Sequence, residues 1–320
     1  MGWRDALRVK QERKRRARLE RLGMLALLLA MLFFVTPVGQ ALTDTLYRMS
    51  GFQGPVEPAP LELHVIDVGK ADAMLLRCEG KTALLDAGSY ASGDRVVDYL
   101  LRIGVKKLDY VIASHPDSDH TGGMAQVLQE LPVGELVIYP WPQEMRRSLE
   151  FQSLEEAAVG CSVPVRERMP GDEIPLGATG LQVLGPLKVY EDTNNCSMVL
   201  RLDYLGFSAL FCGDIENSAE LDLVKSGVDL EVDLLKVPHH GSAGSSSQRF
   251  LEAVSPELAV ISVGPDNSRL PREEALSRLE KAGAKIYRTD TDGDLVFSWD
   301  GEQLTLWSEY HNTVERMGNP

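Results

Sequence analysis

The sequence predicts an α/β fold in which two sheets pack face to face with helices outside, preceded by one transmembrane helix. Short runs of apolar and β-branched residues, bounded by turn formers, recur along residues 61–307 and predict strands. These runs form two groups, each interleaved with stretches of helical periodicity, which suits two packed sheets. A single long apolar stretch, residues 22–42, lies upstream of the predicted domain.

The N-terminal region has the composition of a membrane anchor. Residues 1–21 contain nine Lys or Arg against three acidic residues, and residues 22–38 are uncharged, with the apolar stretch extending to Leu42. That stretch is about 20 residues long, enough to cross a bilayer. The positive-inside rule makes residues 1–21 a cytoplasmic tail and places the domain outside the cytoplasm. The alternative is a secreted protein, because Val38-Gly39-Gln40-Ala41 offers small residues at a signal-cleavage position.

The rest of the chain is strongly acidic. The whole chain has a formal net charge of −14, and residues 1–21 carry +6, which leaves −20 on the remainder. Such a charge repels polyanions at long range and argues against broad, non-specific binding of DNA, although it permits a local metal-centred phosphate site. The four cysteines show no Cys-x-x-Cys spacing, which excludes a zinc knuckle or a thioredoxin-type motif.

The predicted elements follow a linker at residues 43–60, which is rich in Gly and Pro toward its end. The domain spans residues 61–310 and is followed by a C-terminal tail, residues 311–320. Strands are predicted at residues 61–68, 73–77, 82–86, 108–114, 135–139, 181–184, 198–204, 207–212, 233–237, 258–263, 285–288, 295–299 and 303–307. Helices are predicted at residues 96–103, 124–131, 150–158, 219–226, 249–254 and 271–282.

The polar loop after the strand at 108–114 carries the strongest chemical signal. It reads Ser-His-Pro-Asp-Ser-Asp-His-Thr-Gly-Gly over residues 114–123, so two histidines and two aspartates fall within six residues. A loop at the end of a buried strand can aim such side chains at one point. Imidazole and carboxylate together are ligands of Zn, Mn and Fe sites. An ordinary solvated loop is the alternative, and four ligand types at alternating spacing disfavour it.

Three later positions could complete a metal site. Asp214 follows the strand at 207–212, where a Gly-Asp pair is also an ordinary turn. His239 and His240 follow the strand at 233–237, and adjacent residues of an extended segment point to opposite faces. Only one of these two histidines is therefore expected to bind a given metal. Asp86 ends the strand at 82–86, where a turn residue is the alternative.

The loop resembles the first metal motif of the metallo-β-lactamase fold, His-x-His-x-Asp-His. It is more similar to the variant in the hydrolase domain of ComEC/Rec2 competence proteins, where Asp replaces the middle His. His115, Asp117, Asp119 and His120 match that variant position by position. The resemblance covers residues 61–307 and implies an αββα sandwich with metal-dependent hydrolase activity. It also implies a phosphodiesterase or DNase acting through a two-metal activated water, with DNA or another phosphodiester as substrate and DNA-uptake proteins as partners.

The resemblance further implies individual roles. One divalent ion would be held by His115, Asp117 and Asp214, and the other by Asp119, His120, Asp214 and His239. Asp119 and His240 are the expected catalytic residues, His240 lying in the second shell or at the substrate. The remaining expected contacts to ligands or substrate are Asp72, Asp86, Lys70 and Asn267. This oxygen-rich set makes Mn²⁺ as suitable as Zn²⁺.

Two departures from the family pattern leave the substrate open. Residues 68–73 resemble the family's Val-Gly-Gln-Gly-Asp-Ala, with Lys70 and Ala71 replacing Gln and Gly. Lys70 could contact a phosphate or simply be solvated. A later family motif has His-Pro shortly after Asn, whereas Arg269-Leu270-Pro271 lies near Asn267 here. Two alternatives to a DNase remain. One is a hydrolase of a small envelope phosphoester or lactone, and the other is a non-catalytic module of a DNA-uptake or envelope complex.

The predicted anchor can be tested by its orientation. The mature protein should begin at its basic tail and stay with membranes. Protease added to intact cells, after removal of any outer wall, should digest the domain and spare the tail. N-terminal sequencing that starts near Leu42 would show instead that the apolar stretch is a cleaved signal peptide.

Overall fold

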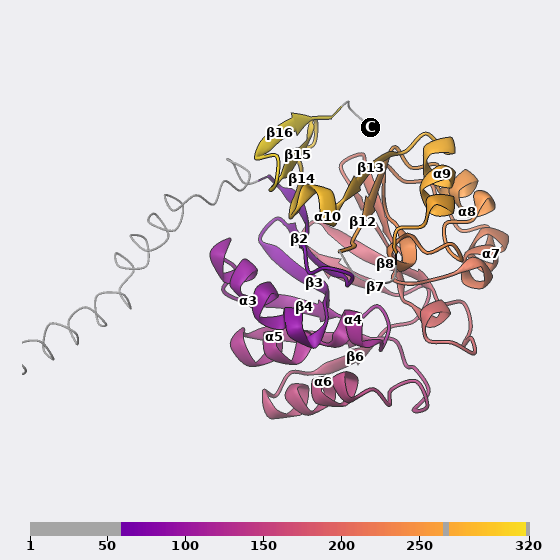
Figure 1. Cartoon of the computed structure of the whole chain (residues 1–320). Coiled ribbons are helices and arrows are strands. Elements are labelled where there is room, and N and C mark those ends of the chain that lie inside the picture. Colours follow the sequence, from indigo (N-terminus) through magenta and orange to yellow (C-terminus); the bar gives the residue numbers. More distant parts are fainter. Residues whose placement is uncertain (1–58, 265–268, 318–320) are drawn as a thin grey trace, which may run out of the picture. The chain divides into compact units, whose positions relative to one another are not determined.

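Two mixed β-sheets pack together and carry helices on their outer sides in the computed structural model of this protein (Figure 1). The structure describes residues 59–264 and 269–317. The predicted tail and anchor, most of the predicted linker and Asn267 lie outside these ranges. Within the described residues, no helix combines the length and apolar character needed to span a membrane.

The first sheet has nine strands in the order β16-β15-β14-β1-β2-β3-β4-β5-β6. Neighbours from β3 to β6 run parallel, and the other pairs are antiparallel. Its strands are β1 (Leu61–Val65), β2 (Ala73–Cys78), β3 (Lys81–Ala87), β4 (Leu108–Ile112), β5 (Val133–Ile138), β6 (Val165–Glu167), β14 (Leu295–Trp299), β15 (Leu304–Ser308) and β16 (Thr313–Arg316).

The second sheet has seven strands in the order β13-β12-β11-β10-β9-β8-β7. Neighbours from β10 to β13 run parallel. Its strands are β7 (Glu173–Leu176), β8 (Thr179–Gly185), β9 (Val199–Tyr204), β10 (Phe207–Phe211), β11 (Leu234–Lys236), β12 (Leu258–Ile261) and β13 (Lys285–Arg288). Each sheet therefore has a parallel block, and polar loops that follow the carboxyl ends of such strands are well placed to form a site.

Helices cover the outer side of each sheet. Beside the first sheet lie α3 (Gly93–Arg102), α5 (Met124–Glu130) and α6 (Leu149–Gly160), and beside the second lie α7 (Asn217–Ser226), α8 (Gln248–Val254) and α9 (Glu273–Lys281) (Figure 1). The short elements are α4 (Ser118–Thr121), α10 (Thr289–Asp292), η1 (Tyr90–Ser92), η2 (Asn194–Cys196) and η3 (Pro238–Gly241). Strands β1, β12 and β14 are buried along their whole length, as expected for strands covered on both faces. This arrangement confirms the predicted αββα sandwich.

Local sequence signals explain several boundaries. Leu205 and Gly206 both have positive φ, 47° and 86°, which suits a type I′ turn and confirms the predicted hairpin between β9 and β10. Helix α6 begins after Ser148, whose hydroxyl accepts a hydrogen bond from the Phe151 N–H at 3.1 Å. Such N-caps satisfy backbone donors that the first helical turn leaves unpaired.

The sequence did not predict strands β6, β7 and β16. Every residue of β6 and β16 is exposed, so neither strand has the apolar alternation that predicts a strand. The expected tail at 311–320 is therefore wrong for residues 313–316, which pair with β15 through backbone hydrogen bonds. The prediction failed because exposed edge strands depend on backbone pairing rather than on side-chain burial.

The packing of α6 gives a stability prediction. Phe151 is fully buried and meets Trp141 edge-to-face at 5.9 Å between ring centroids, whereas the Leu149 side chain is 76% exposed. Phe151→Ala should lower the free energy of unfolding by about 3–5 kcal/mol because it leaves a cavity. Leu149→Ala should change it by less than about 0.5 kcal/mol. Chemical denaturation of both variants measures this, and equal effects would contradict the packing of α6.

Candidate metal centre

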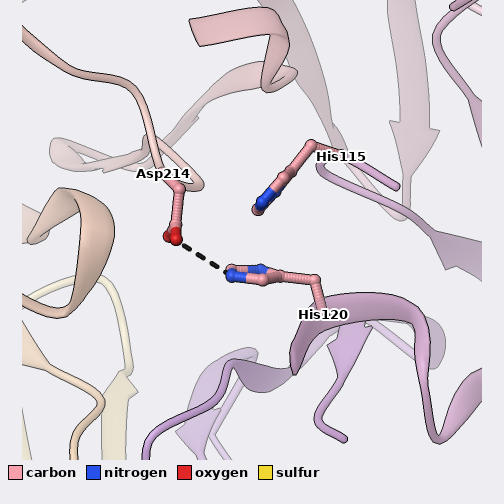
Figure 2. A group of neighbouring side chains, drawn as sticks. All are labelled: His115, His120 and Asp214. Atoms are coloured by element: carbon pink, nitrogen blue, oxygen red, sulfur yellow. Dashed lines mark ion pairs between the residues drawn. The ribbon is translucent and has the colours of Figure 1, made fainter. Parts of the chain in front are cut away.

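The candidate site lies at the carboxyl ends of parallel strands from both sheets. His115 follows β4, and His120 lies in the single turn of α4. Asp214 follows β10, and His240 lies in η3 after β11. Figure 2 shows His115 and His120 from one sheet facing Asp214 from the other. The fold thus brings His120 close to Asp214 and His240, which lie 94 and 120 positions further along the chain.

The Gly-Gly pair after His120 allows α4 to sit close to β3. A Cβ atom on Gly122 would lie 2.4 Å from both the Ser118 carbonyl oxygen and the Tyr90 nitrogen, and one on Gly123 would lie 2.2 Å from the Ala87 carbonyl oxygen. Any larger residue would push α4 away from the end of β3. The two glycines therefore set the position of the histidine-bearing turn.

Three imidazoles are oriented through their Nδ1 atoms. His120 Nδ1 donates to Asp86 Oδ2 at 2.8 Å, and His240 Nδ1 donates to the Ser262 carbonyl oxygen at 2.9 Å. His115 Nδ1 lies 3.1 Å from the Ser114 hydroxyl. A carbonyl oxygen can only accept, so His240 carries its proton on Nδ1, and Nε2 of the neutral ring is left with a free lone pair. Such partners are typical of metal-binding histidines.

Asp86 holds this arrangement from β3. Its Oδ1 accepts from the Ser114 N–H at 2.8 Å, and its Oδ2 accepts from the Ser114 hydroxyl at 2.6 Å. Because the Ser114 proton is donated to Asp86, the hydroxyl oxygen is available to accept from His115 Nδ1. The backbone of Asp86 has a φ of 58°, which is uncommon for a non-glycine residue. One buried carboxylate thus orients His120 directly and His115 through Ser114.

The atoms that face the centre of the cluster lack hydrogen-bond partners. They are buried and comprise Nε2 of His115, His120 and His240 together with Oδ1 of Asp214. His120 Nε2 lies 3.3 Å from Asp214 Oδ1, and His240 Nε2 lies 3.7 Å from Asp214 Oδ2. Ligand atoms of a tetrahedral shell with bonds of about 2.1 Å are about 3.4 Å apart. Three groups among the described residues could hold a cation, His115–His120–Asp214, Asp119–His120–His240 and Asp72–Asp86–His120, and the first two include the unpaired Nε2 atoms, so the residues fit divalent metals.

The charges within the cluster favour binding of a cation in place of the proton on His120. Burial lowers the pKa of His120, but the negative charges of Asp214 and Asp86 outweigh burial and hold that pKa well above its usual value. Burial and the charge of His120 lower the pKa of His115. Burial raises the pKa of Asp214, but His120 and His240 outweigh it and hold that pKa well below its usual value. Without metal, a proton on His120 neutralises part of the buried negative charge.

Lys236 is a member of the site that the sequence analysis did not identify. It is almost fully buried, and its Nζ donates to Asp72 Oδ2 at 2.8 Å and to the Val237 carbonyl oxygen at 3.0 Å. The Asp72 N–H in turn donates to the Asp119 carbonyl oxygen at 3.1 Å, linking the β1–β2 loop to α4. A lysine inside the apolar run of β11 is the signal that could have revealed this pair, because a buried ammonium requires a buried partner.

The two adjacent histidines are arranged in the opposite order from the expectation. Their φ values are 49° and 51°, so the segment is not extended and the alternate-face argument does not apply. His239 Nδ1 pairs with Glu216 Oε1 at 3.0 Å, and its Nε2 is 3.8 Å from Asp214 Oδ2. His240 is fully buried and belongs to one of the groups that could hold a cation, whereas His239 belongs to none of them. The geometry therefore favours His240 as the ligand and turns His239 toward Glu216.

The other expected residues lie at the edge of the cluster. Asp117 Oδ2 is 3.7 Å from His115 Nε2, and its side chain is 38% exposed. Asp119 Oδ2 is 3.6 Å from His240 Nε2 and 2.5 Å from Lys70 Nζ. Asn267 lies outside the described residues.

Glu216 was not singled out from the sequence, since nothing in Asp214-Ile215-Glu216 distinguishes it from an ordinary helix-start residue.

The comparisons with known proteins agree with this fold. The sequence pattern of the metallo-β-lactamase superfamily matches residues 66–264, so the chain belongs to that superfamily. Its sequence is also similar to those of competence proteins.

Three relatives illustrate the relationship. ComE operon protein 3 of Bacillus subtilis (strain 168) is 29% identical over 74% of this chain and 33% of its own length. Competence protein ComA of Neisseria gonorrhoeae is 35% identical over 73% of this chain and 31% of its own length. Recombination protein 2 of Haemophilus influenzae is 27% identical over 77% of this chain and 30% of its own length. The chain thus spans about a third of each of these relatives.

The order of the two histidines gives a direct prediction. His240→Ala should weaken binding of a metal ion at the Asp119–His120–His240 position by more than about a hundredfold, because it removes a side chain that binds the ion directly. His239→Ala should leave that affinity within about threefold of wild type. Isothermal titration of the metal-free variants with Mn²⁺ and Zn²⁺ measures both affinities. The reverse pattern would restore the assignment made from the sequence.

Proposed function

We propose that this protein is a membrane-anchored, extracytoplasmic phosphodiesterase that hydrolyses DNA with two divalent metal ions. The observation that carries the proposal is a buried set of three imidazole Nε2 atoms and one Asp214 oxygen. These atoms face each other and have no hydrogen-bond partner. The names of the relatives, which refer to competence and recombination, support DNA as the substrate.

We assign one metal to His115, Asp117 and Asp214, and the other to Asp119, His120, His240 and Asp214. Asp214 would be shared because it lies in one group with His115 and His120, while its Oδ2 also lies 3.7 Å from His240 Nε2. Carboxylates supply about half of the donors, which suits Mn²⁺ as well as Zn²⁺. When bound here, the cations supply Lewis-acid stabilisation of the negative charge that develops on the phosphoryl group.

The chain's own residues prepare this site and handle protons. Asp86, Ser114 and the Ser262 carbonyl fix the imidazole tautomers, so each Nε2 lone pair faces inward. His239 lies at the edge with a side chain that is 21% exposed, and Glu216 holds its Nδ1. In this position, a His239 ring protonated on both nitrogens could donate its Nε2 proton to the leaving oxygen of a substrate that reaches the site from solvent. His239 therefore takes the catalytic role that was expected from the sequence for His240.

Localisation and partners belong to the same proposal. Residues 22–42 would anchor the domain to the cell membrane, and DNA-uptake proteins would be its partners. The anchor would hold the site where incoming DNA crosses the envelope. The names of the relatives support this setting, and the basic tail followed by an apolar stretch supports the orientation.

The acidic charge of the domain favours a second candidate substrate. A net charge of about −20 outside residues 1–21 opposes the approach of a long polyanion more than that of a small ester. The alternative function is therefore hydrolysis of a small envelope phosphodiester or lactone at the same metal centre. A substrate panel separates the two functions, because both use the same site residues.

The proposed activity is tested with the full chain purified in detergent, single-stranded DNA and Mn²⁺. Asp214→Asn should lower the cleavage rate by more than about a hundredfold because it weakens both metal positions. His239→Gln should lower kcat while metal content stays unchanged. The matched control is Asp229→Asn, because the Asp229 side chain is 74% exposed, and it should retain wild-type activity.

Three outcomes would decide between the functions. Cleavage of small phosphodiesters or lactones without cleavage of DNA would favour the second candidate. Metal-loaded protein that cleaves none of these substrates would favour a non-catalytic module. Cleavage that survives in Asp214→Asn would contradict the proposed centre.

A further inference from the structure

The ammonium group of Lys70 lies against a carboxylate that the second metal position requires. Lys70 Nζ is 2.5 Å from Asp119 Oδ2, and the same oxygen faces His240 Nε2 at 3.6 Å. The side chains of Lys70 and Asp119 are 27% and 23% exposed, so the pair lies at the entrance of the cluster rather than in bulk solvent. A tethered cation thus contacts one of the atoms proposed to bind a metal ion.

The backbone around Lys70 is fixed, so the contact depends on the side chain. The Asp72 N–H donates to the Asp119 carbonyl oxygen at 3.1 Å, which holds the β1–β2 loop against α4. Gly264 packs against the same loop, because a Cβ there would lie 2.4 Å from the Gly69 Cα and 3.0 Å from the Lys70 nitrogen. The Lys70 side chain can rotate away from Asp119 while its Cα stays in place.

Two cations cannot share Asp119 Oδ2 without a cost. A metal ion bound to that oxygen would lie about 2.0–2.2 Å away, so an ammonium remaining at 2.5 Å from the oxygen would be within a few ångströms of a divalent charge. Repulsion between such charges is strong in a partly buried site. The Lys70 ammonium therefore opposes binding of a metal ion through that oxygen.

We propose that Lys70 competes with the second metal ion for Asp119 and so lowers the affinity of that position. The inference rests on the proposed metal site. Lys70 occupies Asp119 in the metal-free protein and is displaced when His120, His240 and Asp119 bind a cation. The displaced ammonium stays at the entrance because its backbone is fixed there, and it can meet an anionic group of the substrate. Occupancy of the second position then depends on the free metal concentration.

The test is a calorimetric titration of the metal-free full chain with Mn²⁺. Lys70→Gln should bind the weaker of the two metal equivalents about tenfold more tightly than wild type, because it removes the competing charge. Lys70→Arg retains the charge and should bind within about threefold of wild type. The matched control is Lys81→Gln, which removes a similar ion pair, Lys81 Nζ to Asp109 Oδ1 at 2.9 Å, at the opposite end of β3. This control should match wild type.

Thermal unfolding provides a second measurement. The rise in Tm on saturation with Mn²⁺ should be larger for Lys70→Gln than for wild type, because the variant gains the metal without losing an ion pair. If the wild type binds Mn²⁺ and Lys70→Gln binds it with the same or weaker affinity, the role of Lys70 is overturned but the metal site is not. Absence of metal binding in every protein would overturn the metal site itself, and with it this inference.

Discussion

The carboxylate of Asp214 is buried among imidazoles, and the rest of the site follows from the cost of burying that charge. An ionised carboxylate away from water requires compensating charge and hydrogen bonds. The Ser197 hydroxyl bonds the Asp214 N–H at 3.0 Å and fixes the start of the loop, while His120 and His240 face the two carboxylate oxygens. In the metal-free protein, a proton on His120 supplies part of the compensation. Divalent cations bound here would supply more of it from the same place.

Positive charge is distributed around this centre in two layers. Lys236 neutralises Asp72 in the interior, where neither group reaches solvent, and Lys70 pairs with Asp119 at the entrance. The inner pair is fixed by burial and joins β11 to the β1–β2 loop. The outer pair is partly exposed to solvent, so a metal ion can replace the Lys70 ammonium at Asp119. This difference makes Lys236 a structural charge and Lys70 a competitor for the metal.

The sequence predicted the sandwich and the clustering of His115 and His120 because both depend on local patterns. The apolar strands around residues 108–114 and the spacing of His115 to His120 are visible without tertiary information. The order of His239 and His240 was not, because it depends on two left-handed backbone conformations in η3. The Lys236–Asp72 pair was missed because its members are 164 residues apart. Strand β16 was missed because every one of its residues is exposed, so it lacks the apolar alternation that predicts a strand.

The measurement that tests the central claim most directly is anomalous diffraction from crystals grown with Mn²⁺ and, separately, Zn²⁺. We expect one metal peak bound by Asp119, His120 and His240, and a second peak bound by His115 and Asp117. Asp214 should contact both peaks. The Lys70 ammonium should have left Asp119 in that structure. A peak bound by His239 in place of His240, or crystals that hold metal only at the surface, would contradict the account.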